Sequence, residues 1–163
     1  MRIAGVQAGR GFGKQPVRGP VRVGAENVEG DKQMDRRYHG GPDKAVLAYS
    51  ADHYPLWRAE LSWPDLPFGG FAENLSVEGV TEDTACVGDV WRAGTAVLQI
   101  SSPRFPCIKI PRFWRRPALL ERVVETGRTG WYMRVLEPGV LQEGDEIALL
   151  ERGAVTVRCA SES

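Results

Sequence analysis

Short apolar segments alternate with glycine- and proline-rich turns along most of this 163-residue chain. Nineteen glycines and eleven prolines are scattered through it, so few segments keep a helical spacing of apolar residues. The apolar segments are instead rich in β-branched and aromatic residues, which favour strands. The pattern predicts a mainly β structure, with strands at residues 2–7, 20–23, 45–49, 73–77, 90–93, 96–101, 130–136, 146–150 and 154–158.

Two segments, 52–61 and 117–126, combine helix caps with helical apolar spacing. Ser50 is the expected N-cap of the first helix, and Gly127 is expected to end the second. Eight or more strands with only two short helices predict a closed or nearly closed β-barrel, because closure removes the exposed edges of an open sheet. We expect such a barrel to carry its site in the loops at its mouth.

Size and composition narrow the class of protein. The length suits one domain, expected to span 1–163 with a barrel core at about 1–158. No apolar run approaches the ~20 residues of a membrane helix, and the amino terminus lacks a secretory signal. Three widely spaced cysteines suit a reducing compartment, so we expect a cytoplasmic protein. The 21 basic and 21 acidic residues balance, which gives no general attraction to nucleic acid.

Positive charge is nevertheless concentrated in one stretch, residues 99–120, which contains no Asp or Glu and has Cys107 at its centre. A cation-rich setting favours the thiolate, the form of cysteine that attacks electrophiles and binds soft metals. Pro103 and Pro106 predict an irregular turn after a strand, where reactive groups are common. The alternative is a packing role between apolar neighbours, which on spacing alone is the commoner fate of a free cysteine.

Two polar loops precede this stretch. The loop at residues 29–44 is long for a small domain, and its His39, Asp43 and Lys44 could respectively supply a proton, orient a base and pair with an anion. The same loop could equally be a solvated surface. The glycine-rich segment at residues 9–16 lacks a phosphate-binding pattern and is interpreted as a flexible connection, with ligand binding as the alternative.

Six segments, in order, resemble the MOSC family, the molybdenum cofactor sulfurase C-terminal domain. They are HGGPDKAV (39–46), ADHY (51–54), FGGFAENLSVEG (68–79), VGD (87–89), SSPRFPC (101–107) and GRTGWYMRVLEPG (127–139). The chain is most similar to the stand-alone bacterial members linked to hydroxylaminopurine resistance. The resemblance implies a MOSC-type β-barrel in which Cys107 carries the function, either as a thiolate ligand of molybdenum or as the holder of a transferable sulfur.

The resemblance also implies a molybdenum–pterin cofactor and a reaction, the reduction of N-hydroxylated compounds to amines. His39 and Asp43 would then act with Cys107 in catalysis. The other implied residues are cofactor contacts: Lys44, Asn74, Arg104, Lys109 and Arg128. No flavin, nicotinamide or iron–sulfur motif is evident, so a separate reductase is the expected electron donor. We expect no pyridoxal-phosphate site, since the sequence resembles only a minimal MOSC domain.

Two other functions are compatible with the sequence. A carrier would bind the cofactor or a persulfide on Cys107 and pass it on without turnover. A nucleic-acid-binding barrel would use Phe105, Phe113 and Trp114, which interleave with arginines as in stacking grooves. The zero net charge places this last interpretation behind the others.

Overall fold

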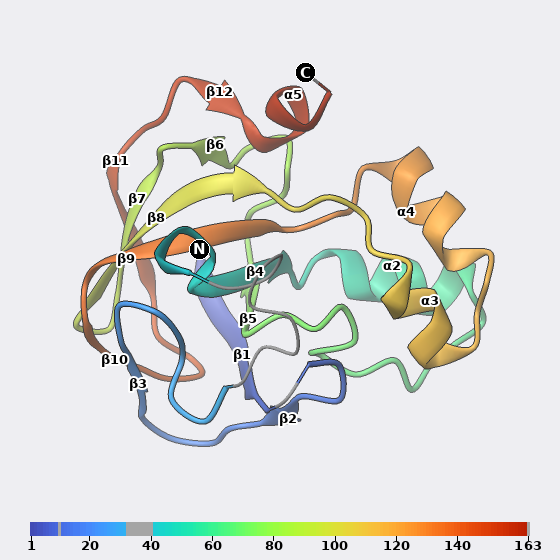
Figure 1. Ribbon diagram of the computed structural model, residues 1–163, viewed down its shortest axis with the longest axis horizontal. Helices are drawn as coiled ribbons and strands as arrows, with labels where there is room; N and C mark the ends of the chain where they lie inside the picture. Colours follow the sequence, from blue (N-terminus) through green and yellow to red (C-terminus); the bar gives the residue numbers. More distant parts are fainter. Residues whose placement is uncertain (10, 32–40, 163) are drawn as a thin grey trace.

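The computed structural model describes residues 1–9, 11–31 and 41–162, and it is mainly β, as predicted (Figure 1). Strands occur where apolar and β-branched residues recur between turns. They are β1 (Arg2–Ala8), β2 (Gln15–Pro16), β3 (Val21–Val23), β4 (Val46–Ser50), β5 (Leu75–Glu78), β6 (Cys86–Val87), β7 (Val90–Ala93), β8 (Ala96–Pro103), β9 (Trp131–Glu137), β10 (Gly139–Leu141), β11 (Ile147–Glu151) and β12 (Val155–Thr156).

Eight strands form one curled sheet in the order β11-β7-β8-β9-β4-β5-β1-β2, and two short ladders, β10-β3 and β12-β6, flank it. Only β4 and β5 run parallel within the eight-stranded sheet. Ile3 N donates to Asp145 O and Ile147 N donates to Met1 O, both at 2.9 Å, so β1 is hydrogen-bonded to the start of β11. The sheet thus curls into a half-barrel in which β1 and β11, strands from opposite ends of the sheet order, contact each other. This confirms the strand-rich barrel predicted from the sequence.

The described residues contain four α-helices rather than two. The expected pair is present as α2 (His53–Glu60) and α4 (Leu119–Thr126), and α4 ends at Gly127 with a left-handed φ of 70°. The others are α3 (Lys109–Trp114) and α5 (Val157–Ser161), together with a 3-10 turn, η1 (Pro42–Lys44). No helix in the described part of the chain is long and apolar enough to cross a membrane.

Two sequence predictions about element ends were wrong. Ser50 is the last residue of β4 and not a helix N-cap; its Oγ accepts a hydrogen bond from Asp52 N at 3.3 Å, and α2 starts one residue later. The strand predicted at 154–158 stops at Thr156, whose hydroxyl accepts a hydrogen bond from Cys159 N and caps α5.

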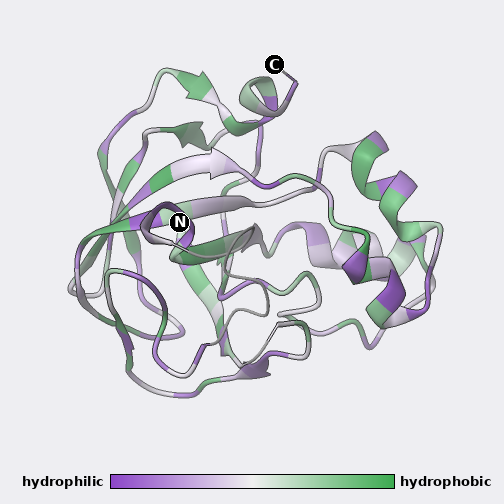
Figure 2. Ribbon diagram, in the orientation of Figure 1, coloured by the Kyte–Doolittle hydropathy of each residue, from purple (hydrophilic) through white to green (hydrophobic). Residues whose placement is uncertain are grey.

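The described residues form two hydrophobic cores. The larger fills the curled sheet and includes Trp91 and Trp131, whose rings meet edge to face at 6.1 Å. The smaller lies where α2, α3 and α4 gather on one side of the sheet (right in Figure 1), and it contains Tyr49, Trp57 and Phe71. Figure 2 shows a largely hydrophobic β4, whose five residues are all buried, so this strand joins the two cores. The full burial of an apolar side chain as large as valine or leucine contributes about 2 kcal/mol to the free energy of unfolding.

Candidate functional site

Cys107 lies on the turn that links β8 to α3. The strand ends at Pro103, opposite Trp131 of β9, and Arg104 N donates to Gly130 O at 3.1 Å as the chain leaves the sheet. The Cys107 side chain is partly exposed and packs at the edge of the smaller core. The structure thus places the thiol on an irregular turn after a strand, as the two prolines predict.

A small cavity, which we call the cysteine cavity, lies against Cys107. Arginines and apolar groups form its walls, and no Asp or Glu is among the described residues that line it. The lining consists of Phe71, Arg104, Pro106, Cys107, Ile110, Pro111, Leu119, Leu120, Val123, Arg128 and Thr129. Its volume is about 10 Å³, room for about one water molecule. A larger group must therefore reach the Cys107 sulfur from the exposed side of the turn.

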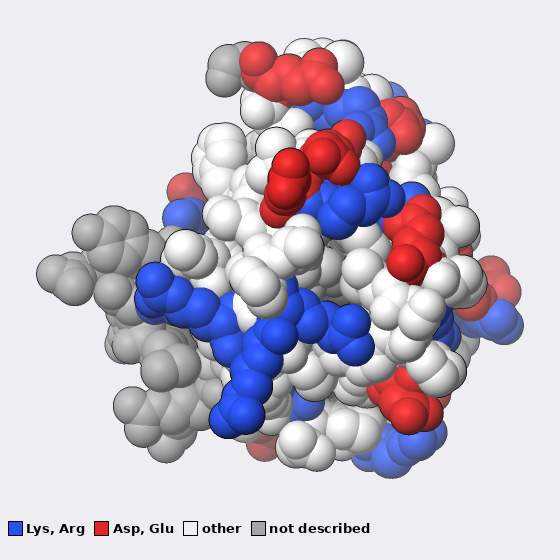
Figure 3. Space-filling model, turned by 90° about the vertical axis from the view of Figure 1, so that its right-hand side faces the viewer, with Lys and Arg blue, Asp and Glu red and all other residues white. Residues whose placement is uncertain are grey.

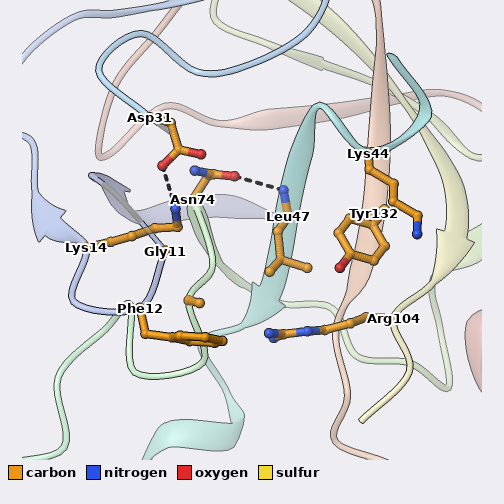
Figure 4. Close-up of a pocket in the computed structure, with 10 residues that line it drawn as sticks. Gly11, Phe12, Lys14, Asp31, Lys44, Leu47, Asn74, Arg104 and Tyr132 are labelled. Atoms are coloured by element: carbon orange, nitrogen blue, oxygen red, sulfur yellow. Dashed lines mark hydrogen bonds and ion pairs between the residues drawn. The ribbon is translucent and has the colours of Figure 1, made fainter. Parts of the chain in front are cut away.

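A second cavity, which we call the basic pocket, is shown in Figure 4. It shares the lining residue Arg104 with the cysteine cavity. Its volume is about 60 Å³. Among the described residues, three cationic side chains and one carboxylate line it together with polar and aromatic groups. The lining residues are Gly11, Phe12, Lys14, Asp31, Lys44, Leu47, Ala72, Asn74, Arg104 and Tyr132. Three positive charges against one negative on these described residues favour an anionic ligand.

Arg104 is held rigidly between the two cavities. Its side chain is buried, and Nη1 donates a hydrogen bond to the Phe71 carbonyl oxygen. In Figure 4 the guanidinium lies below Tyr132 and beside the ring of Phe12. Burial raises the pKa of the Tyr132 hydroxyl, and the nearby Cys107 sulfur raises it further, while Arg104 acts in the opposite direction. Tyr132 therefore keeps its proton at neutral pH and can donate a hydrogen bond into the pocket.

Lys14 and Asp31 form a buried ion pair in the wall of the basic pocket. Nζ of Lys14 lies 2.5 Å from Oδ1 of Asp31, and both side chains are almost fully buried. Gly9 N also donates to Asp31 Oδ1, at 3.2 Å. The pair links the glycine-rich segment to Asp31, so this segment is a fixed part of the pocket wall rather than a flexible connection, and its role in ligand binding stays a prediction. Its lysine and its single aromatic residue were the signals that the sequence analysis missed.

Of the predicted cofactor contacts, Lys44, Asn74 and Arg104 line the basic pocket, and the predicted catalytic residue Asp43 does not. The Lys44 ammonium lies over the Tyr132 ring, 5.2 Å from its centre. Asn74 is buried, and its Oδ1 accepts from Leu47 N at 2.9 Å while Nδ2 donates to Gln7 O at 3.4 Å. Its amide therefore bridges β1 and β4 as well as facing the pocket.

The remaining predicted residues occupy different surroundings. Asp43 is exposed and pairs with Arg134 at 2.9 Å. Lys109 is exposed on α3 and lines neither cavity. Arg128 lines the cysteine cavity, but its guanidinium pairs with Glu60 at 2.9 and 3.0 Å, which lowers the pKa of that carboxyl. His39 lies outside the described residues.

The protein side chains alone do not form a metal cage in the described part of the chain. No group of three or more His, Cys, Asp and Glu residues there is placed to hold a metal ion. What the site offers is one accessible thiol, Cys107, beside fixed positive charge. This donor set fits a soft metal that brings its own sulfur ligands and an anionic tail.

Comparison with known proteins agrees with the motifs. The MOSC domain matches residues 35–148. The Bacillus subtilis protein YflK is 47% identical over 143 residues, covering 88% of this chain and 64% of YflK. A Gibberella moniliformis protein named as a reductase is 44% identical over 142 residues, covering 85% of this chain but only 25% of that protein. The crystal structure of YiiM from Geobacillus stearothermophilus superposes with a TM-score of 0.84 at 35% identity, covering 96% of this chain and 80% of YiiM.

Proposed function

Because the chain belongs to the MOSC domain family, we propose that it is a molybdenum-cofactor protein that reduces N-hydroxylated compounds, with Cys107 as the metal ligand. The observation that carries this proposal is the partly exposed Cys107 thiol at the edge of an acid-free cavity, next to a buried arginine. The printed name of the Gibberella relative supports a reductive reaction.

The residues around Cys107 fit the proposed cofactor. A thiolate is a soft ligand suited to molybdenum, and Arg104 with Lys44 and Lys14 would hold an anionic tail by charge-assisted hydrogen bonds. When bound, the cofactor would supply two-electron redox chemistry. The overall reaction is R–NHOH + 2 H⁺ + 2 e⁻ → R–NH₂ + H₂O, so the protein must also deliver protons.

The side chains named in the prediction, together with Tyr132, would divide the remaining tasks. Tyr132, which keeps its proton, would donate a hydrogen bond to a ligand in the basic pocket. Asn74, held by its two backbone contacts, would present its amide at a fixed position. Asp43, exposed in the middle of η1, would relay protons from solvent, and His39 is the proposed proton donor. Arg128 would maintain positive charge beside Cys107 while its contact with Glu60 fixes its position.

A carrier of the cofactor, or of sulfur as a persulfide on Cys107, is the second candidate. The small volume of the cysteine cavity favours it, since a substrate has little room beside the thiol in this conformation. A thiol that is reachable from the surface suits transfer to another protein.

One experiment separates the two functions. Protein from a host that makes the cofactor is assayed for molybdenum and pterin, and then for reduction of an N-hydroxylated purine with dithionite-reduced methyl viologen. The proposed enzyme retains the cofactor and turns over repeatedly. A protein that carries labile sulfur or cofactor but shows no turnover with this donor is a carrier, and that result would contradict the enzymatic proposal.

A further inference from the structure

The face formed by α3 and the turn before it carries exposed apolar and cationic side chains together. Phe105, Ile108 and Phe113 are 68%, 51% and 49% exposed. Three cations on the same segment, Lys109, Arg112 and Arg115, are exposed as well. Figure 3, which views the side of the molecule where α3 and α4 lie, shows a group of Lys and Arg side chains with no Asp or Glu among them.

The two arginines of this face have no acidic partner in the described part of the chain, since none of its ion pairs includes Arg112 or Arg115. Arg116 differs, because it stacks on Trp63 at 4.0 Å and is half-buried. The positive charges of Arg112 and Arg115 are therefore available to a binding partner.

A shallow groove on this face lies between α3 and α4. It has a volume of about 410 Å³ and is lined by Ile108, Pro111, Arg112, Arg115, Pro117 and Leu120. Pro111 and Leu120 also line the cysteine cavity, so a molecule in the groove is separated from Cys107 by one layer of side chains. An apolar floor with cations at its edge is the usual composition of a protein interface.

We propose that this face is the docking surface for a small acidic electron-carrier protein that holds a flavin or an iron–sulfur group. The inference rests on the proposed function, because the reduction consumes two electrons that an outside donor must deliver. A donor in the groove would release its electrons beside Cys107. Complementary charge steers such transient encounters, and redox complexes bury little surface, which suits a patch of this size.

Other anionic partners fit the face less well. Ordinary nucleic-acid binding uses about 6–10 phosphate contacts, and binding to anionic lipid uses clusters of about 4–8 basic residues. The exposed cations of this segment number three, Lys109, Arg112 and Arg115. A protein surface supplies both the carboxylates and the apolar side chain that would fill the groove.

The test uses the double variant Arg112→Gln/Arg115→Gly. Arg115 ends α3 with a left-handed φ of 56°, a conformation that glycine adopts more readily, so this change removes a charge without straining the fold. The matched control is Arg22→Gln/Arg92→Gln, which removes two exposed charges from β3 and β7, far from α3 in Figure 1. Thermal unfolding should show both variants folded.

Binding of an acidic flavodoxin and of a plant-type [2Fe–2S] ferredoxin is measured by calorimetry at low and high salt. Wild type should bind at least one of them, more weakly as salt rises, and the double variant should bind about tenfold more weakly while the control is unchanged. Lack of binding to both carriers, equal loss in the control, or tighter binding of a single-stranded oligonucleotide or of anionic vesicles would overturn the proposal.

Activity gives a second readout that separates this inference from the proposed function. With dithionite-reduced methyl viologen the double variant should match wild type, whereas turnover driven by the reduced carrier should fall about tenfold. No turnover with the chemical donor in any variant would refute the proposed enzymatic function, and the binding measurement would still decide the docking surface. Equal rates for wild type and double variant with the carrier would refute the docking surface alone.

Discussion

His53 Nε2 lies 2.6 Å from Oε1 of Glu82, and both side chains are buried. The other carboxylate oxygen of Glu82 accepts a hydrogen bond from Gly130 N at 2.8 Å. The Glu82 carboxylate therefore links His53 of α2 to the turn just before β9. Thr129 of that turn lines the cysteine cavity. The relationship connects the helical side of the molecule to the proposed site.

Glu82→Ala should lower the free energy of unfolding by about 3 kcal/mol, because it leaves a buried histidine and a buried backbone N–H without their acceptor. Glu82→Gln keeps one acceptor oxygen and should cost less. Urea unfolding of the two variants at neutral pH measures the difference. Equal stability of Glu82→Ala and wild type would contradict the assigned role.

Breaking the Lys14–Asp31 pair should destabilise the walls of the basic pocket. Lys14→Met leaves the Asp31 carboxylate buried without its cation, and a loss of about 3 kcal/mol is expected. Lys14→Met combined with Asp31→Leu should recover part of that loss, because no unpaired charge remains. A double-mutant cycle by chemical denaturation tests this, and additive losses would argue against a direct interaction.

Alkaline pH should weaken the fold through two buried tyrosines. Burial raises the pKa of Tyr49 and of Tyr54 well above 10.0, and nearby carboxylates, Glu82 for Tyr49 and Glu73 for Tyr54, raise them further. Below pH 10 both hydroxyls are protonated in the folded and unfolded states. As the pH rises above that value the unfolded chain releases protons that the folded chain keeps, so stability falls by about 1.4 kcal/mol per pH unit for each tyrosine.

Tyr54→Phe isolates one of these contributions. The variant loses a hydrogen bond to Glu73 and starts from a lower stability, so the slope of unfolding free energy against pH is the quantity to compare. Above pH 10 that slope should be shallower than in wild type by about 1.4 kcal/mol per pH unit. An unchanged slope would show that Tyr54 titrates normally in the folded state.

The sequence predicted most of the sheet because strand-forming residues and turn residues alternate clearly. It missed α3, since Pro111 lies inside it and its cations interrupt the apolar spacing. It also extended the last strand past Thr156, where the capping hydroxyl that starts α5 becomes evident only from the contact with Cys159. These are local effects that propensity alone does not resolve.

The candidate site was predicted only where a motif marks it. The turn with Cys107 followed from the acid-free stretch and its prolines, whereas Arg104 was implied only by the family resemblance. The Lys14–Asp31 pair could not be predicted, because the fold brings together two loops whose sequences share no pattern. Asn74 was recognised as important, but its bridging of β1 and β4 depends on strand order, which a single sequence does not give.

The molybdenum content of three cysteine variants tests the central claim most directly. Cys107→Ser removes the soft anionic donor with a nearly isosteric change, whereas Cys86 is buried beside Arg152 and Cys159 is exposed on α5. Each variant is made in a cofactor-competent host, checked by thermal unfolding, and analysed for molybdenum per protein. We expect Cys107→Ser to fold but to lose the metal and the reduction of an N-hydroxylated purine, while Cys86→Ser and Cys159→Ser keep both. Metal retained by Cys107→Ser at the wild-type level, or lost equally in all three, would contradict the account.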